Sequence, residues 1–355
     1  MDPLLPSTRR PPPIRVTRPE PALAEGVARL PHAAVVFHPG KTPADRLSGI
    51  VDEAAHRHGW EPTRWYETAA ADSGREAART ALTEGAALVL VAGGDGTVRA
   101  VVDAVRGTGI PIALLPLGTG NLLARNLGAP RNDMAGSVAT AFAGSTRAVD
   151  VGLAELSDDA GHRRTHAFVV MAGMGLDADM AEGTNALAKK HLGWWAYVTP
   201  IATSILKNRS FSLRYRVDEG PVRTARAHTV IIGNCGTLTG NMLLLPAARI
   251  DDGRLDVVMM RPAGRLGWTG IGSRLTLQGW ARRSRLTRTL LSYAGDLRAL
   301  AYTQGSRFEA AFDEPRQIQL DGDGDGFGEV RRVRISVLPG ALLIRTNGEG
   351  SPTDR

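Results

Sequence analysis

Residues 86–97 read AALVLVAGGDGT, and this stretch decides which fold to expect. Its apolar first half has the length and composition of a buried strand, and residues 98–105 after it have the period of an amphipathic helix. Glycines in the turn between them let the backbone approach a ligand closely. The first helical turn then directs N–H groups and a positive dipole end toward an anion. Asp95 would repel a polyphosphate unless a divalent cation lay between them, so the stretch predicts a site for a nucleotide triphosphate and a metal ion.

The length and composition bound the class of protein. A chain of 355 residues is long enough for about two domains. A hydrophobic fraction of 43% and a charged fraction of 22% are typical of a soluble globular protein. The net charge is +7, carried mainly by arginine, because only four of the 43 basic residues are lysines. Attraction to an anionic lipid surface or a nucleic acid, or a coding bias toward arginine, would each explain this balance.

The chain shows no targeting or membrane-spanning pattern. It contains no run of about 18 apolar residues, so no membrane span is predicted. Residues 1–21 are rich in proline and arginine and lack the apolar centre of a signal peptide, so we expect a disordered basic tail. The single cysteine, Cys235, excludes an internal disulfide and fits a reducing cytoplasm. It lies in an apolar run, which is typical of an inert core thiol.

Apolar strands alternate with amphipathic helices between residues 32 and 150. Strands are predicted at 33–37, 64–68, 86–91 and 112–115, and helices at 43–58, 74–84, 98–105 and 134–143. This alternation favours a doubly wound, mainly parallel sheet. Ligands of such sheets bind at the carboxyl ends of the strands, where the two glycine-rich turns at 93–97 and 117–121 are expected to lie.

The pattern changes after residue 150. Strands are predicted at 167–171, 211–217, 227–233, 255–260, 317–320 and 333–338, and helices at 194–207 and 266–283. Turns rich in Gly, Asp, Asn and Pro separate the strands, which favours a mainly antiparallel, sandwich-like domain. We therefore expect a disordered tail at 1–30, an α/β nucleotide domain at 31–150, a β-rich domain at 151–346 and a disordered tail at 347–355.

Four further motifs follow GGDGT along the chain. They are PLGTGN (116–121), GMGLDA (173–178), DDGRLD (251–256) and LDGD (320–323). In this order the set resembles the lipid kinases of the diacylglycerol kinase catalytic-domain superfamily, which includes diacylglycerol, sphingosine and bacterial lipid kinases. The resemblance extends over about residues 32–344. It implies an α/β domain for ATP, a β-rich lipid-binding domain that carries the catalytic aspartate, and an active site in the cleft between them.

The resemblance also implies roles for individual residues. Asp321 corresponds to the base that takes the proton of the lipid hydroxyl, with Asp323 as a supporting acid. General-base assistance of this kind typically accelerates a reaction by ~10²–10⁴-fold. The expected nucleotide contacts are Thr68, Gly93, Gly94, Asp95, Gly96, Thr97, Gly118, Thr119, Gly120 and Asn121.

Two Mg²⁺ ions are implied by the same resemblance. The catalytic ion would be linked to Asp95, directly or through water. A second, structural ion would be bound by the carboxylate of Asp252 and the main-chain carbonyls of Arg249 and Arg254. A metal that bridges the phosphates neutralises charge during phosphoryl transfer, which depends mainly on positioning and electrostatics.

The chain departs from the family pattern at four places. The first strand ends FHPGK (37–41), with His38 where Asn-Pro-x-Ser-Gly has its Asn. Ala100 replaces a glutamate that commonly follows GGDGT, and Asp323 replaces a glutamate in the LDGD motif. Leu122 stands where many bacterial members have an aspartate. These departures bear on nucleotide contacts, metal geometry and activity, and they leave the aspartates of GGDGT and LDGD intact.

Several alternatives remain open from the sequence. An NAD kinase also uses a GGDGT turn, but the Asn-Glu pair of that family is absent after Thr97. A lipid- or nucleotide-binding relic without activity would also retain these motifs. The stretch DGDGDG (321–326) matches the first half of a calcium-binding EF-hand loop, although Arg332 stands at its twelfth position. The same stretch could be a hairpin turn without chemistry, and Asp252-Gly253 could be a type I′ turn.

The sequence thus predicts an ATP-dependent kinase for a diacylglycerol-like or sphingoid lipid. Its expected partners are a membrane lipid and, through arginines such as those at 282, 283 and 285, the anionic surface of the membrane. No nucleic-acid partner is expected, and a homodimer is compatible with the sequence. We expect a cytoplasmic location with peripheral contact at the inner face of the membrane.

Overall fold

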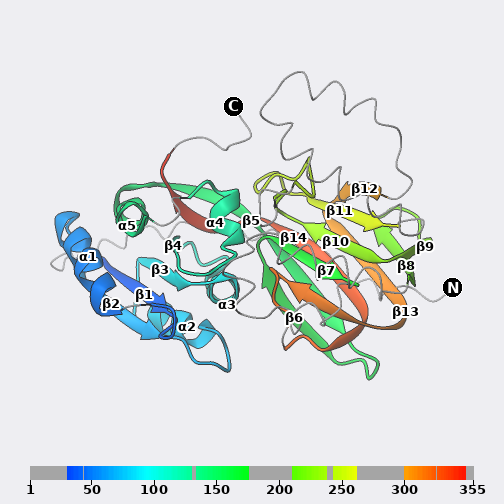
Figure 1. Cartoon of the computed structure of the whole chain (residues 1–355), viewed down its shortest axis with the longest axis horizontal. Helices are drawn as coiled ribbons and strands as arrows, with labels where there is room; N and C mark the ends of the chain where they lie inside the picture. The colour runs from blue at the N-terminus through cyan, green and yellow to red at the C-terminus, as the bar shows by residue number, and fades with distance from the viewer. Residues whose placement is uncertain are drawn as a thin grey trace, which may run out of the picture.

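The computed structural model describes residues 30–42, 44–129, 133–175, 210–237, 243–261, 300–324 and 326–348. They form two lobes, and the long strand β14 (Glu329–Thr346) belongs to both (Figure 1). Most of the two predicted tails, the predicted helices at 194–207 and 266–283 and the arginines at 282, 283 and 285 lie outside the described residues.

The N-terminal lobe is built on a parallel sheet. Its strands, in the order β4-β3-β1-β2, are β1 (His32–Phe37), β2 (Glu61–Glu67), β3 (Leu88–Gly93) and β4 (Ile112–Pro116). Every pairing among them is parallel. The helices are α1 (Ala44–Arg57), α2 (Arg75–Thr83), α3 (Asp95–Val105), α4 (Leu122–Asn126) and α5 (Met134–Ala143). The predicted doubly wound α/β lobe is confirmed.

Both faces of this sheet are covered, which explains its nearly continuous apolar strands. Successive strand residues point to opposite faces. Val35 accordingly belongs to a buried cluster with Val51 of α1, whereas Val36 belongs to another with Ala78 of α2 and Val102 of α3. The strands therefore lie between two helical layers.

The C-terminal lobe consists of antiparallel strands in two layers. They are β5 (Ser145–Ser157), β6 (Arg163–Phe168), β7 (Met171–Met174), β8 (Phe211–Val217), β9 (Arg223–Ala227), β10 (Thr229–Gly233), β11 (Leu255–Met260), β12 (Leu300–Gly305) and β13 (Arg307–Leu320). Side chains of both layers, such as Ile335 of β14 and Ile232 of β10, share one buried cluster. The predicted antiparallel, sandwich-like lobe is confirmed.

Strand β13 connects the two layers. Its first residues pair with β8 and β14, and after a register shift between Ala311 and Arg316 its last residues, 318–320, pair with β7. This path delivers residue 321 to the base of the sandwich beside the N-terminal lobe. The expected domain boundary at residue 150 falls inside β5, which pairs with β14 along almost its whole length.

Two predicted strands are each divided in the structure. The segment predicted at 167–171 separates into β6 and β7 at Val169 and Val170, whose N–H groups bond to a side chain rather than to a strand. The segment predicted at 227–233 separates into β9 and β10 at His228. Strands β5 and β12 were not predicted, because small and polar residues interrupt their alternation.

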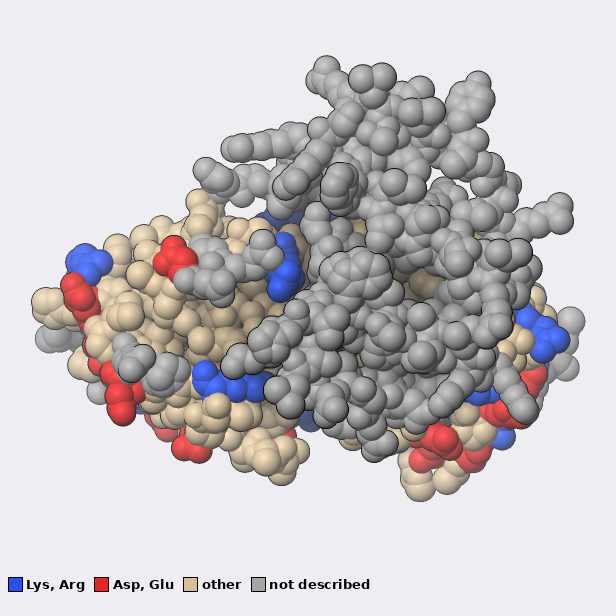
Figure 2. Space-filling model, in the orientation of Figure 1, with Lys and Arg blue, Asp and Glu red and all other residues tan. Residues whose placement is uncertain are grey.

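The described surface carries charges of both signs. On the face shown in Figure 2, Lys and Arg side chains are interspersed with Asp and Glu at both ends of the molecule. The described part of this face is therefore not uniformly basic, despite the net charge of +7. Among the described helices, none combines the length and the apolar character needed to cross a membrane.

Candidate active site

The strand order places the candidate site. The chain runs from β1 outward to β2 and then returns to β3 on the other side of β1. Ligands of such sheets bind beyond the carboxyl ends of the strands where the order reverses. Here those ends carry FHPGK after β1 and GGDGT after β3.

The GGDGT turn leads directly into α3. Gly94 is the N-cap residue, in an extended conformation, and Asp95 is the first helical residue. A Cβ on Gly93 would lie 2.7 Å from the Cβ of Thr97, so only glycine allows this threonine to fold back on the turn. The N–H groups of the first helical turn have no partners within the helix, which suits them to a phosphate.

Asp95 joins the two glycine-rich turns. Its Oδ1 accepts a hydrogen bond of 2.6 Å from the N–H of Leu122, at the start of α4. A Cβ on Gly120 would lie 2.4 Å from Oδ2, so the second turn needs glycine there. Burial raises the pKa of Asp95, although backbone hydrogen bonds oppose the shift. A cation beside this buried carboxylate would favour its charged form.

The second turn packs against the first through backbone atoms. A Cβ on Gly118 would lie 2.6 Å from the Cα of Gly94. Asn121, left-handed at φ 47°, accepts a hydrogen bond from the N–H of Gly118 and donates one to its carbonyl. Thr119 lies between these residues, with its carbonyl near the guanidinium of Arg125. The two predicted nucleotide turns are thus brought together.

The end of β1 supplies a third wall. The Nδ1 of His38 accepts a hydrogen bond from the N–H of Gly40, at 3.1 Å, as the side chain of an asparagine does in an Asx turn. The imidazole thereby holds the backbone turn that follows β1. The Nζ of Lys41 lies 3.5 Å from the position that a Cβ on Gly94 would take. Thr68, buried directly after β2, has its N–H bonded to Phe37 at the same edge of the sheet.

The sequence interpretation missed Lys41. Its ammonium group lies beside the first glycine turn, where it would contact an anion bound there. The available signal was its position directly after a strand in a chain with only four lysines.

The LDGD motif forms a tight turn after β13. Asp321 and Gly322 take φ angles of 54° and 83°, and Leu320 and Asp323 exchange two backbone hydrogen bonds of 2.8 and 3.0 Å. Two left-handed central residues are the mark of a type I′ turn, which favours Asp-Gly. The predicted alternative of a hairpin turn is therefore correct for the backbone, but it does not explain the carboxylates of Asp321 and Asp323.

The Asp321 carboxylate is buried and points toward the break between β6 and β7. Its Oδ2 accepts from the N–H of Val169, and its Oδ1 accepts from those of Val170 and Met171, at 2.7–3.0 Å. The residue is 3% exposed, and burial raises its pKa to about 6. The negative charge of Asp95 contributes to this shift, so these two carboxylates lie within electrostatic reach of each other.

Asp323 lies on the other side of the turn. Its side chain is 28% exposed, and its Oδ2 lies 3.0 Å from Nη2 of Arg99 in α3. The same oxygen lies 3.6 Å from the position of a Cβ on Gly96. The LDGD turn therefore rests directly on the first turns of the GGDGT helix.

The residues expected at the structural Mg²⁺ site lie between β10 and β11. Asp252 accepts from the N–H of Arg254, and Gly253 alone of the Asp-Gly pair is left-handed, so the type I′ alternative is wrong. Burial raises the pKa of both Asp150 and Asp256, and the charge of Asp252 adds to both shifts.

This acidic cluster fits a cation without forming a complete site. Oδ2 of Asp256 is buried and has no hydrogen-bond partner. Carboxylate and carbonyl oxygens are the ligands that Mg²⁺ prefers. In the described parts of the chain, however, no three His, Cys, Asp or Glu side chains are arranged to hold a metal. Main-chain carbonyls, such as those of Arg249 and Arg254, would have to complete the coordination.

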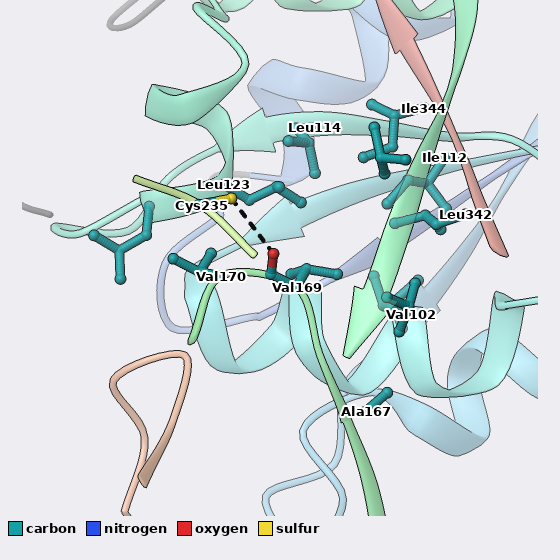
Figure 3. Close-up of a cluster of buried hydrophobic side chains, with 14 of the residues drawn as sticks. Val102, Ile112, Leu114, Leu123, Ala167, Val169, Val170, Cys235, Leu342 and Ile344 are labelled. Atoms are coloured by element: carbon teal, nitrogen blue, oxygen red, sulfur yellow. Dashed lines mark hydrogen bonds between the residues drawn. The ribbon is translucent and has the colours of Figure 1, made fainter. Parts of the chain in front are cut away.

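Cys235 lies in the core beside the break between β6 and β7. Its Sγ is 3.5 Å from the carbonyl of Val169 (Figure 3), and the residue is 2% exposed. Burial raises the pKa of the thiol, and the charge of Asp321 adds to the effect. A thiol that resists ionisation in this way is a poor nucleophile, as predicted for a core cysteine.

Two family models match the chain. The diacylglycerol kinase catalytic domain matches residues 32–154, and the YegS C-terminal NAD kinase beta sandwich-like domain matches residues 169–275. The link to NAD kinases therefore appears only in the description of the second lobe.

Relatives and a solved structure agree with these matches. A "probable lipid kinase YegS-like" protein of Pseudomonas aeruginosa is 31% identical over 285 residues, which cover 78% of this chain and 82% of the relative. A diacylglycerol kinase of Mycobacterium tuberculosis is 28% identical over 274 residues, or 77% and 81% of the two chains. The crystal structure of a diacylglycerol kinase from Bacillus anthracis has the same fold, with a TM-score of 0.61 at 16% identity over 91% and 99% of the two chains. The chain matches both family models in order along its sequence and is similar over most of its length to proteins named lipid kinases. It therefore belongs to the bacterial lipid kinases of the diacylglycerol kinase superfamily, which transfer phosphate to an alcohol group.

Proposed function

We propose that this enzyme transfers the γ-phosphate of ATP to the hydroxyl group of a diacylglycerol-like or sphingoid lipid. The observation that carries the proposal is the contact between the two motifs: Asp323 of the LDGD turn lies against Gly96 of the GGDGT helix. The nucleotide would bind with its phosphates over the first turn of α3, within reach of Lys41. Thr68 and the turn at residues 118–121 would border the nucleotide.

Asp321 fits the role of the base. A carboxylate has about four lone-pair positions, and backbone N–H groups use three of them, which leaves one on Oδ2. With a pKa of about 6, the group is ionised at neutral pH and is a stronger base than an ordinary aspartate. The lipid oxygen would bond to the γ-phosphorus as the bond to the β-phosphate breaks, its proton would pass to Asp321, and ADP would leave.

Divalent cations would assist from two places. Mg²⁺ on the phosphates, held by Asp95 directly or through water, would neutralise their negative charge. A second Mg²⁺ would be held by Asp252 with the carbonyls of Arg249 and Arg254, and it would relieve the charge repulsion in that cluster.

The experiment compares phosphate transfer from labelled ATP to extracted lipids by the native enzyme and two variants. Asp321→Asn should lower kcat by ~10²–10⁴-fold, the range for loss of a general base. The matched control is Asp218→Asn, because Asp218 is also left-handed, at φ 50°, and also accepts backbone N–H bonds, far from the site. Equal labelling by the native enzyme and Asp321→Asn would remove Asp321 from the reaction.

The same assay separates the alternatives. Supplying NAD in place of lipid tests for an NAD kinase, and binding of ATP without transfer to any lipid would identify an inactive relic. Mass spectrometry of the products would name the lipid acceptor.

A peripheral association with anionic membranes is part of this proposal. A water-insoluble acceptor requires the enzyme to work at a lipid surface, and the net charge of +7 favours an anionic one. Flotation with vesicles that contain anionic lipid, compared with neutral vesicles, tests it: equal binding to both would contradict an electrostatic attraction.

A further inference from the structure

One face of α3 carries three charged residues spaced by four. They are Asp95, Arg99 and Asp103, and residues at this spacing lie above one another on a helix. Asp95 binds the second glycine turn, as described above. Asp103 pairs with Arg75 at 2.6 Å and accepts from the N–H of Ala167 in β6. Each charged residue of this row therefore ties α3 to a different segment.

Arg99 is the central member of the row, and it is deeply buried for an arginine. Its side chain is 9% exposed, and its Nη2 lies 3.0 Å from Oδ2 of Asp323. Its guanidinium lies 4.9 Å from the ring centroid of Phe327, which in turn contacts the ring of His166 edge-on at 5.0 Å. A buried arginine needs compensation of this kind, because an unpaired charge is costly to desolvate.

The ion pair holds more than one side chain. Asp323 exchanges two backbone hydrogen bonds with Leu320, so restraining Asp323 restrains the whole type I′ turn and Asp321 at its centre. Phe327 lies just beyond Asp323, so Arg99 contacts the last residue of the turn and the segment that follows it.

We propose that Arg99 is a positioning residue, which fixes the LDGD turn on the nucleotide helix and thereby sets the place of Asp321 relative to the bound phosphates. The inference rests on the proposed kinase function. Phosphoryl transfer depends on alignment, and a displacement of about 1 Å can lower a rate by ~10²-fold. Arginine suits the role because its planar guanidinium binds a carboxylate and stacks on an aromatic ring at the same time.

The test uses Arg99→Met, which can still pack its thioether on the Phe327 ring but removes the charge and the ion pair with Asp323. We expect kcat to fall by about 10- to 100-fold while the KM for ATP stays within about threefold, because alignment rather than binding is lost. Arg99→Lys should recover part of the rate. The control is Arg79→Met in α2, whose ion pair with Glu76 is exposed on both sides, and it should match the native enzyme. If Arg99→Met does not fold, as judged by circular dichroism, Arg99→Lys carries the comparison.

Coupling to Asp323 decides between positioning and a separate role. In the Asp323→Asn background, Arg99→Met should lower kcat by less than about threefold further, since its partner is already altered. Three results would overturn the proposal. They are effects of the two substitutions that multiply independently, a kcat of Arg99→Met within threefold of the native value, and a change in Arg99→Met that is confined to KM.

Hydrogen exchange gives a readout without catalysis. The amides of residues 320–323 should exchange faster in Arg99→Met than in Arg79→Met, and unchanged exchange would also overturn the proposal. If the native enzyme phosphorylates no lipid, the proposed function fails, whereas the exchange experiment still reports whether Arg99 restrains the turn.

Discussion

The pH dependence of stability tests the environment assigned to Asp321. Its pKa is raised to about 6 in the folded chain from an ordinary 3.8, because burial outweighs the three N–H donors. A raised carboxyl pKa means that folding favours the protonated form. This contribution to stability is complete below pH 3.8 and is lost as the pH rises through about 6. Between these limits the slope approaches ~1.4 kcal/mol per pH unit.

The magnitude follows from the same two pKa values. Lowering the pH from 7.5 to 4.5 should give the native protein about 2 kcal/mol of stability through this group alone. Asp321→Asn does not titrate, so its stability relative to the native protein should fall by that amount over the same range. Urea unfolding at the two pH values measures the difference, and titrating groups shared by both proteins cancel.

The control for this comparison is Asp218→Asn, which replaces an aspartate with similar backbone contacts. This variant separates the loss of an aspartate that accepts backbone hydrogen bonds from effects that are specific to residue 321. If the difference in stability between Asp321→Asn and the native protein does not change with pH, the effects of burial and of the N–H donors on the pKa of Asp321 cancel. If the native protein instead loses stability relative to the variant at pH 4.5, the three hydrogen bonds dominate and the pKa is lowered. Either result would refute the assignment.

Three further predictions concern the walls of the site. Gly118→Ala should destabilise the fold by ~1–3 kcal/mol and weaken ATP binding in calorimetry, because its Cβ would clash with the first glycine turn. The control Gly49→Ala, in an open helical position, should stabilise the fold by ~0.5–1 kcal/mol, and equal melting temperatures of the two variants would contradict the close packing. His38→Asn should keep the turn and the activity, whereas His38→Ala should lower the free energy of unfolding in urea by ~0.5–1.5 kcal/mol, because the N–H of Gly40 loses its acceptor. An equal loss of stability in both variants would exclude that hydrogen bond. Removal of Mg²⁺ by a chelator should lower the melting temperature of the native protein but not of Asp252→Asn, and an equal shift in both would place the ion elsewhere.

The fold was predictable where the information is local. Helix α5 has the predicted bounds, because Asp133 caps it at the start through the N–H of Gly136 and apolar residues face the sheet. Strands such as β8 and β11 were also predicted with their observed bounds, because turn residues flank them. Strand β5 was not predicted, because what makes it a strand is its pairing with β14, nearly two hundred residues later, rather than an alternating pattern in its own sequence.

The glycine turns of the site were also local, and both lie where they were predicted. Their mutual contact was implied by parallel strands that end at one edge of a sheet. A hairpin turn at Asp321 was predicted as one alternative. What its carboxylate binds was not, because the three N–H groups belong to a strand break about 150 residues earlier.

The break between β6 and β7 and the burial of Asp321 explain each other. Buried N–H groups require acceptors, and a continuous strand over 167–171 would have found them in a neighbouring strand. Here the carbonyl of Val170 is bonded by the N–H of Asn234, while the N–H groups of residues 169–171 face the LDGD turn. An apolar residue at 321 would leave three buried donors without acceptors, at roughly 1–3 kcal/mol each. The same carboxylate therefore stabilises the fold and lies within electrostatic reach of Asp95 at the nucleotide turn, so variants at 321 have to be judged on rate and stability together.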